Sequence, residues 1–388
     1  MHMADTNSQL YYGFEQGPIR PPSEAYSLLI RVTRNCPWNR CTFCHLYKGK
    51  EFSARPVEHV LKDIEAVATC IDTLRRVAGG SDRLTRPDVE KAARICTGVD
   101  LFAFNAACNW FAAGMKSVFL QDSNSLAVPP DDMVAILEHL RARFPWIERI
   151  TSYSRSSTAA RIEDADLQRM RQAGLNRIHI GLESGSDEVL RMVRKGATKE
   201  LHVKAGRKIK DAGMELSEYY MPGLGGKDLY RENAIETADA MNQIDPDFIR
   251  LRPLAIPDGT PLCEQYEAGQ FQKSNDLLMA QELLLFLEHL DGILSMVKSD
   301  HILNLFADLE GRLPEAKEHM IGIVRSFLEM DVDRQQLYQV GRRLGIFSSL
   351  RDLEDPARAA RAEEARGRIL AHADNLNDVM DELMKRFI

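Results

Sequence analysis

The sequence predicts an α/β fold: a partial (β/α)6 TIM-type barrel with inserted helices and a C-terminal helical region. Three observations predict it. Short apolar runs alternate with helical patterns over residues 26–265, which is typical of a parallel sheet. Three helical patterns end at Gly114, Gly174 and Gly213, directly before a strand, and glycine is common just past a helix end. From about residue 270 the strand signals fade and leucine-rich helical periodicity takes over.

Each element follows from these patterns. The predicted strands are residues 27–33, 116–121, 149–155, 177–182, 215–221 and 247–252. Residues 77–113 are expected to insert two helices, because Pro87 suits a first helical turn and Gly98 a helix end. Pro314 and Pro356 are expected to start later helices, with Asp355 as an N-cap. We therefore expect an N-terminal arm at 1–25, a barrel at 26–265 and a helical region at 266–388.

Composition limits the function. The 388 residues carry a net charge of -7, with 44% hydrophobic and 28% charged residues. An acidic chain does not favour a broad nucleic-acid-binding face, so no nucleic-acid partner is expected. No apolar run is long enough for a membrane span. The first residues lack the basic and then apolar pattern of a secretory signal, which predicts a cytoplasmic protein with reduced thiols.

Three of the seven cysteines fall within nine residues, at Cys36, Cys41 and Cys44. Soft thiolate ligands favour zinc or an iron–sulfur cluster. A zinc site with His45 as fourth ligand is one interpretation. A four-iron cluster held by three cysteines is the other, and it leaves one iron open to a substrate. The remaining four cysteines lack short ligand spacing and are expected to be buried thiols; they are Cys70, Cys96, Cys108 and Cys263.

Polar residues follow two of the predicted strands. Active sites in β/α barrels lie at the C-terminal ends of strands. Asp122, Ser123 and Asn124 follow the second strand, where a simple turn is the alternative interpretation. The run Gly181-Leu182-Glu183-Ser184-Gly185 follows the fourth strand. Ser186 is expected to cap the next helix.

The placement of the cysteines after the first strand, and the ending Cys41-Thr42-Phe43-Cys44, resembles the radical SAM (S-adenosylmethionine) superfamily. Four residues separate Cys36 from Cys41, where the usual pattern has three. The chain thus carries a variant CX4CX2C motif. The run at 181–185 resembles the branch shared by methylthiotransferases and coproporphyrinogen dehydrogenases.

The resemblance implies a [4Fe-4S] cluster on Cys36, Cys41 and Cys44, with SAM bound to the open iron. One electron from a reduced flavodoxin or ferredoxin would cleave SAM into methionine and a 5′-deoxyadenosyl radical. The radical would abstract hydrogen from a small-molecule substrate whose identity the sequence does not give. The alternative is an iron–sulfur electron-transfer or SAM-sensing protein without radical catalysis.

The resemblance also implies a set of SAM contacts. Asp122 would accept from the SAM amino group, Glu183 would accept from the ribose hydroxyls, and Lys195 would pair with the SAM carboxylate. An arginine near the barrel mouth could also hold a carboxylate. The open alternatives are a solvated lysine at a helix end for Lys195 and an outward-facing strand residue for the arginine. The complete set of expected cofactor contacts is Phe43, Asp122, Ser123, Asn124, Glu183, Ser184, Lys195 and Arg252.

Overall fold

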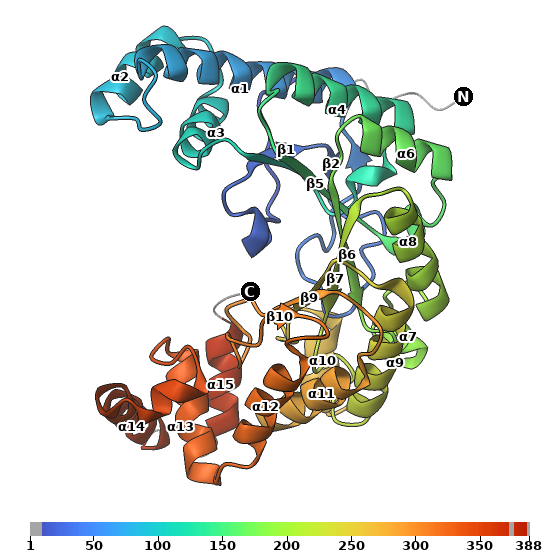
Figure 1. Ribbon diagram of the computed structural model, residues 1–388, viewed down its shortest axis with the longest axis vertical. Coiled ribbons are helices and arrows are strands. Elements are labelled where there is room, and N and C mark those ends of the chain that lie inside the picture. The colour runs from blue at the N-terminus through green and yellow to red at the C-terminus, as the bar shows by residue number, and fades with distance from the viewer. Residues whose placement is uncertain (1–9, 372–375, 386–388) are drawn as a thin grey trace. The chain divides into compact units, whose positions relative to one another are not determined.

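The computed structural model describes residues 10–371 and 376–385. Eight strands follow the order β1-β4-β5-β6-β7-β8-β9-β10 in one sheet, and β2 and β3 form a separate antiparallel pair (Figure 1). The strands are β1 (Leu28–Arg31), β2 (Thr33–Arg34), β3 (Ser53–Ala54), β4 (Ser117–Gln121), β5 (Arg149–Ser154), β6 (Arg177–Glu183), β7 (Glu215–Tyr220), β8 (Phe248–Leu251), β9 (Met296–Lys298) and β10 (Gly311–Arg312).

Helices alternate with these strands through most of the chain (Figure 1). The α-helices are α1 (Val57–Val77), α2 (Arg86–Ile95), α3 (Leu101–Ala112), α4 (Pro130–Arg143), α5 (Ser156–Ala159), α6 (Asp164–Gln172), α7 (Asp187–Met192), α8 (Lys199–Asp211), α9 (Tyr230–Ile244), α10 (Pro261–Glu267), α11 (Asp276–His289), α12 (Lys317–Leu328), α13 (Val332–Arg343), α14 (Pro356–Leu370) and α15 (Leu376–Lys385). Short 3-10 turns are η2 (Pro22–Glu24), η3 (Ser125–Ala127) and η4 (Leu350–Glu354).

The chain divides into two compact units. Among the described residues, the first comprises 10–37, 49–179 and 208–215, and the second comprises 38–48, 180–207, 216–371 and 376–385. In the first unit β1, β4 and β5 are parallel, with Leu28 opposite Val118 and Ser117 opposite Arg149. Helices α1, α3 and α4 pack together, and α1 and α3 contact β1. Each of the three strands contributes fully buried apolar residues, such as Ile30, Phe119 and Ile150, which is the core expected of a covered parallel sheet.

In the second unit β7, β8 and β9 are parallel and β10 is antiparallel to β9. Helices α9, α11 and α12 pack in sequence on one another. An apolar core that includes Val189, Leu224 and Leu262 receives Phe43 at its edge. Helices α13, α14 and α15 form a further packed group at the C-terminal end of the chain. The ring of Tyr338 lies within 6.2 Å of the rings of Phe306, Phe327 and Phe347.

The mostly parallel sheet with alternating helices confirms the predicted α/β, partial TIM-type class. The three helix-terminating glycines all have positive φ angles: 83° at Gly114, 112° at Gly174 and 77° at Gly213. The inserted pair appears as α2 and α3. Asp355 caps α14 by accepting hydrogen bonds from two backbone amides.

Some details of the expected elements were wrong. The region after residue 270 contributes β9 and β10 to the sheet, although their two or three residues are too short to show an alternating pattern. The expected first strand divides into β1 and the two-residue β2, which pairs with β3. Pro314 precedes α12, which begins at Lys317. Part of the predicted arm, residues 1–9, lies outside the described residues.

Candidate functional site

The cysteine loop is shaped by backbone turns and a lysine. Asn35 and Asn39 flank Cys36 with φ angles of 64° and 46°, a region that asparagine tolerates better than most residues. Lys48 donates from Nζ to the backbone oxygens of Asn39 at 3.2 Å and Cys41 at 2.8 Å. Within the part of the chain that the structure describes, Cys36, Cys41 and Cys44 form no disulfide bond. Lys48 thus holds the backbone carbonyls on either side of Arg40, one of which belongs to Cys41.

The described residues contain no group of three His, Cys, Asp or Glu side chains close enough to hold a metal ion. The donor set of the loop nevertheless fits an iron–sulfur cluster. It supplies three thiols within nine residues, and iron–sulfur clusters are held by cysteine thiolates. Ligand groups need not be assembled before a metal binds.

Residues 38–48 of this loop are fastened to the segment that follows α7. The Trp38 indole Nε1 donates to the Arg194 backbone oxygen at 2.7 Å. The Thr42 amide donates to the Val193 oxygen, and the Leu262 amide donates to the Thr42 oxygen, at 3.0 and 3.1 Å. A Cβ on Gly196 would lie 2.4 Å from the Trp38 ring. The packing of the indole therefore leaves no room for a side chain at residue 196.

Glu183 and Lys195 form an ion pair at the end of β6. The Lys195 Nζ lies 3.1 Å from Glu183 Oε1, and the two side chains are 12% and 14% exposed. Lys195 Nζ also lies 6.0 Å from the centre of the Phe43 ring, within cation–π range. A Cβ on Gly181 would lie 2.3 Å from Glu183 Oε1 and 3.1 Å from Lys195 Nζ. Three of the residues expected to contact SAM are therefore neighbours.

Glu218 on β7 is a further acidic group in this region. Its side chain is fully buried, and within the described residues neither carboxylate oxygen accepts a hydrogen bond of good geometry. Burial raises the pKa of Glu218 well above its ordinary value, and nearby Glu183 adds to the shift. The Lys195 ammonium and the Leu182 backbone oppose it. The region thus holds two carboxyl groups around one ammonium.

Ser184 and Ser186 shape the start of α7. Ser184 Oγ accepts from the Ser186 amide at 3.0 Å, and Ser186 Oγ accepts from the Val189 amide at 3.3 Å. The second bond confirms Ser186 as the N-cap. The Gly185 amide donates to Thr237 Oγ1 at 2.8 Å. A Cβ on Gly185 would lie 2.2 Å from a backbone oxygen of α9. The Gly-Leu-Glu-Ser-Gly run is therefore also a packing motif.

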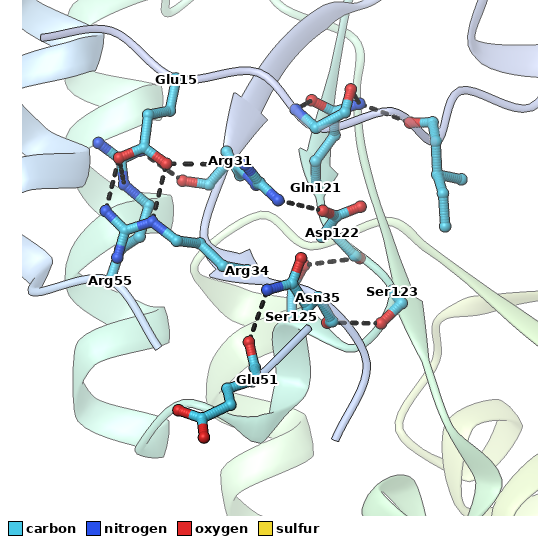
Figure 2. Close-up of polar contacts among 12 residues, drawn as sticks. Glu15, Arg31, Arg34, Asn35, Glu51, Arg55, Gln121, Asp122, Ser123 and Ser125 are labelled. Atoms are coloured by element: carbon cyan, nitrogen blue, oxygen red, sulfur yellow. Dashed lines mark hydrogen bonds and ion pairs between the residues drawn. The ribbon is translucent and has the colours of Figure 1, made fainter. Parts of the chain in front are cut away.

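The polar run after β4 is engaged differently (Figure 2). Asp122 is fully buried, and its Oδ2 lies 2.9 Å from an Arg31 guanidinium nitrogen. Arg31 also lies 3.7 Å from Glu15. The Ser123 hydroxyl donates to the Asn35 backbone oxygen at 2.9 Å. Asn124 donates to Thr158 Oγ1 and accepts from the Arg155 amide, both at 2.9 Å.

A charged network that the sequence did not indicate surrounds this run. Glu15 contacts three arginines, namely Arg31, Arg34 and Arg55 (Figure 2). Burial raises the pKa of Glu15, but the arginines outweigh it and leave the pKa below its ordinary value. Arg55 is buried and pairs with buried Asp63 at 2.6 Å. These partners are far apart in sequence, so no local spacing could have predicted them.

Arg252 is exposed and follows β8. Burial, with a smaller contribution from the Arg252 charge, lowers the pKa of His301 to about 4. His301 Nδ1 accepts from the Leu303 amide at 3.3 Å, which is a structural role. Arg250 is buried, donates to Ser217 Oγ at 3.0 Å and pairs with Asp300.

Three of the other cysteines interact with one another. Burial raises the pKa of the Cys70 thiol to about 12 and that of the Cys108 thiol to about 11, and Cys96 adds to both shifts. Cys263 Sγ donates to Glu267 at 3.5 Å. Cys70, Cys96 and Cys263 are buried, as free cysteines often are.

Residues 30–238, more than half of the chain, match the radical SAM superfamily. The chain belongs to this superfamily. Its members are enzymes that use a [4Fe-4S] cluster and SAM. The expected resemblance is thereby confirmed, and the cysteine loop and both polar strand ends lie within the matched residues.

Curated relatives match only part of the chain. A tRNA uridine(34) acetyltransferase of Methanocaldococcus jannaschii is 26% identical over 110 residues, which cover 28% of this chain and 20% of that protein. A protein of the same organism with the provisional name methylthiotransferase is 24% identical over 196 residues, 49% of this chain and 34% of that protein. The matches thus span about a fifth to a third of these relatives.

Among solved structures, coproporphyrinogen III oxidase from Escherichia coli, described as a radical SAM enzyme, has a TM-score of 0.43 and 16% sequence identity. The match covers 68% of this chain and 52% of that chain. Within the residues that the structure describes, no helix is both long and apolar enough to cross a membrane.

Proposed function

We propose that this chain binds a [4Fe-4S] cluster through Cys36, Cys41 and Cys44 and cleaves SAM reductively to initiate radical chemistry on a small-molecule substrate. The observation that carries the proposal is the superfamily match over residues 30–238, which includes all three cysteines. The cluster supplies the electron that breaks the bond between the SAM sulfur and the ribose 5′ carbon. The protein residues bind and orient the two cofactors.

In this proposal Glu183 and Lys195 separate to bind opposite ends of SAM. Glu183 accepts hydrogen bonds from ribose hydroxyls, and Lys195 pairs with the SAM carboxylate. The ion pair supports this assignment because it is 3.1 Å long, slightly exposed and packed against Gly181, where a side chain would collide with it. Charge-assisted bonds to carboxylates are the stronger kind of hydrogen bond. Lys195 would therefore exchange one carboxylate partner for another.

The β4 end contributes less directly. Asp122 already pairs with Arg31, so its carboxylate is shared if it also accepts from the SAM amino group. Ser123 and Asn124 use their side chains to hold Asn35 and the start of α5. We propose that Ser123 and Asn124 position the backbone beside Cys36, and that Asp122 accepts from the SAM amino group while it stays paired with Arg31.

The test is anaerobic reconstitution with iron and sulfide, followed by incubation with SAM and dithionite. The expected result is about four irons per chain and formation of 5′-deoxyadenosine and methionine. If zinc binds instead of iron, the cluster assignment is wrong. If the cluster forms but SAM stays intact, the chain is an electron-transfer or SAM-sensing protein.

A tRNA substrate is the second candidate. The names of three relatives as tRNA uridine(34) acetyltransferases favour it, and the net charge of -7 disfavours it. Reconstituted protein incubated with bulk tRNA and SAM separates the candidates. Faster 5′-deoxyadenosine formation with tRNA, together with a modified nucleoside in the digested RNA, would overturn the small-molecule proposal.

A further inference from the structure

An open groove of about 710 Å³ lies against the cysteine loop. It is lined by Trp38, Arg40, Lys48, Asp187, Leu190, Arg191, Arg194, Gly196, Ala197, Thr198 and Pro261. We call this surface the basic groove. Four of its lining residues are cations and one is an acid, although the whole chain carries a net charge of -7. The groove is therefore a local reversal of the overall charge of the protein.

Three of the cations are available to a partner. Arg40, Arg191 and Arg194 are exposed, and within residues 10–371 and 376–385 none of them pairs with a carboxylate. The acid, Asp187, is engaged because its Oδ1 accepts from the Lys199 amide at 2.7 Å. Arginine forms strong paired hydrogen bonds with carboxylates. The groove therefore fits a surface that presents several carboxylates.

The groove also includes part of the cysteine loop itself. Trp38 and Arg40 stand in the four-residue stretch between Cys36 and Cys41, and Lys48 donates to the Cys41 backbone oxygen. The opposite lining comes from Arg191 to Thr198, which the indole of Trp38 joins through Arg194 and Gly196. A protein seated in the groove would touch the backbone that carries the cysteines. Electron transfer is faster over short distances, so a redox partner bound in the groove would be close to the cysteine loop that is proposed to hold the cluster.

We propose that the basic groove docks the acidic face of a one-electron donor protein, such as a reduced flavodoxin or ferredoxin. This inference rests on the proposed function, because it supplies that reaction with its electron. In each turnover the donor is oxidised by one electron and the cluster is reduced by one, and no covalent bond forms between the two proteins. Complementary charge steers such encounters and accelerates association.

A nucleic acid fits the basic groove less well. A phosphate backbone needs a cationic face along its path, and beyond the groove this acidic chain would repel it. A small acidic protein needs complementary charge only within the groove itself. Four cations in one groove agree with the small, transient interfaces of redox partners.

The experiment uses the reconstituted full chain with a triple variant, Arg40→Glu, Arg191→Glu and Arg194→Glu. SAM cleavage is measured with reduced flavodoxin and its NADPH-dependent reductase, and separately with dithionite, a small reductant that needs no docking. We expect the flavodoxin-supported rate at limiting flavodoxin to fall about tenfold or more, and the dithionite-supported rate to stay unchanged. The wild-type rate with flavodoxin should fall as salt increases, and the variant should lose this dependence.

A matched control reverses three exposed arginines elsewhere, Arg83, Arg94 and Arg361, and should keep the wild-type flavodoxin rate. If the groove variant does not fold or load iron, the single variant Arg40→Glu repeats the test. An unchanged flavodoxin rate overturns the docking proposal. So does a loss of bulk tRNA binding by the groove variant without any effect on the flavodoxin rate. If wild-type protein cleaves no SAM even with dithionite, the proposed function fails instead.

Discussion

The ends of β4 and β6 carry similar polar runs but treat them differently. After β4, Asp122, Ser123 and Asn124 bind protein partners: a guanidinium, a backbone oxygen and a neighbouring turn. After β6, Glu183 bonds with Lys195, and the pair remains slightly exposed. Among residues 10–371 and 376–385, nothing forms a hydrogen bond of good geometry with the nearby Glu218 carboxylate. The polar groups of one strand end are thus engaged mainly by the protein, while the other end holds charge that a ligand can use.

The difference teaches that position at a strand end does not identify a ligand site by itself. Buried polar groups must be hydrogen-bonded or they destabilise the fold. When a protein supplies every partner, the residues serve structure first. When a pair is held together but accessible, a ligand can replace one partner without leaving a buried charge alone. The β6 end meets this second condition.

The largest effect is expected in the cysteine loop, which is hydrogen-bonded to the segment that follows α7. Replacing Cys41 with Ala removes one of three thiolates, and we expect the reconstituted protein to lose essentially all of its cluster. Iron and sulfide content and the visible absorbance measure this. Cys108→Ala is the matched control, because Cys108 lies on α3 outside the motif. Equal iron loss in both variants would contradict the ligand assignment.

A smaller effect tests whether the β4 end is structural. Asp122→Asn removes the shorter of the two ion pairs of Arg31 and leaves the longer contact to Glu15 at 3.7 Å. Breaks in buried pairs cost about 3–5 kcal/mol. Arg31 is 15% exposed, so we expect roughly 2–3 kcal/mol in the free energy of unfolding of the apoprotein. Urea unfolding measures it.

The double variant Arg31→Met with Asp122→Asn is the companion measurement to this prediction. Removing both charges should recover part of the stability lost in Asp122→Asn, because no charge is then left unpaired. A single variant as stable as the wild type would show that the ion pair does not hold the β4 end. The contrast between the two strand ends would then disappear.

Much of this arrangement could be predicted from local pattern. The glycines that end helices before β4, β6 and β7, the caps Ser186 and Asp355, and the cysteine motif are all short-range signals. Partners brought together by the fold could not be predicted, including Glu15 with its arginines and Lys195 with Glu183. Strands β9 and β10 were missed because two or three residues show no period. Glu218 lies within a predicted strand, but its burial next to Glu183 and Lys195 is visible only in three dimensions.

A further prediction tests whether the β6 end serves SAM. Glu183→Gln keeps the size of the side chain but weakens its bonds to ribose hydroxyls, and we expect SAM to bind about tenfold more weakly, or about 1.4 kcal/mol. Equilibrium binding to the cluster-loaded protein measures this. Iron content should not change. Glu188→Gln, an exposed change on α7, is the control. Unchanged SAM affinity in Glu183→Gln would remove Glu183 from the site.

The smallest expected effect concerns Arg252, which is predicted to contact SAM and has an exposed side chain. Its charge contributes to holding the pKa of His301 at about 4, so the neutral ring persists through neutral pH. Arg252→Ala should raise the pKa of His301 by less than about one unit, because burial is the larger cause. NMR titration of the His301 ring measures the shift.

The same titration tests whether Arg252 binds SAM. If Arg252 binds the SAM carboxylate, SAM should raise the pKa of His301 in the wild type by partly neutralising the guanidinium. SAM should have no such effect in Arg252→Ala. A wild-type pKa that SAM leaves unchanged would place Arg252 outside the SAM site and leave the β6 end as the main source of charge for the cofactor.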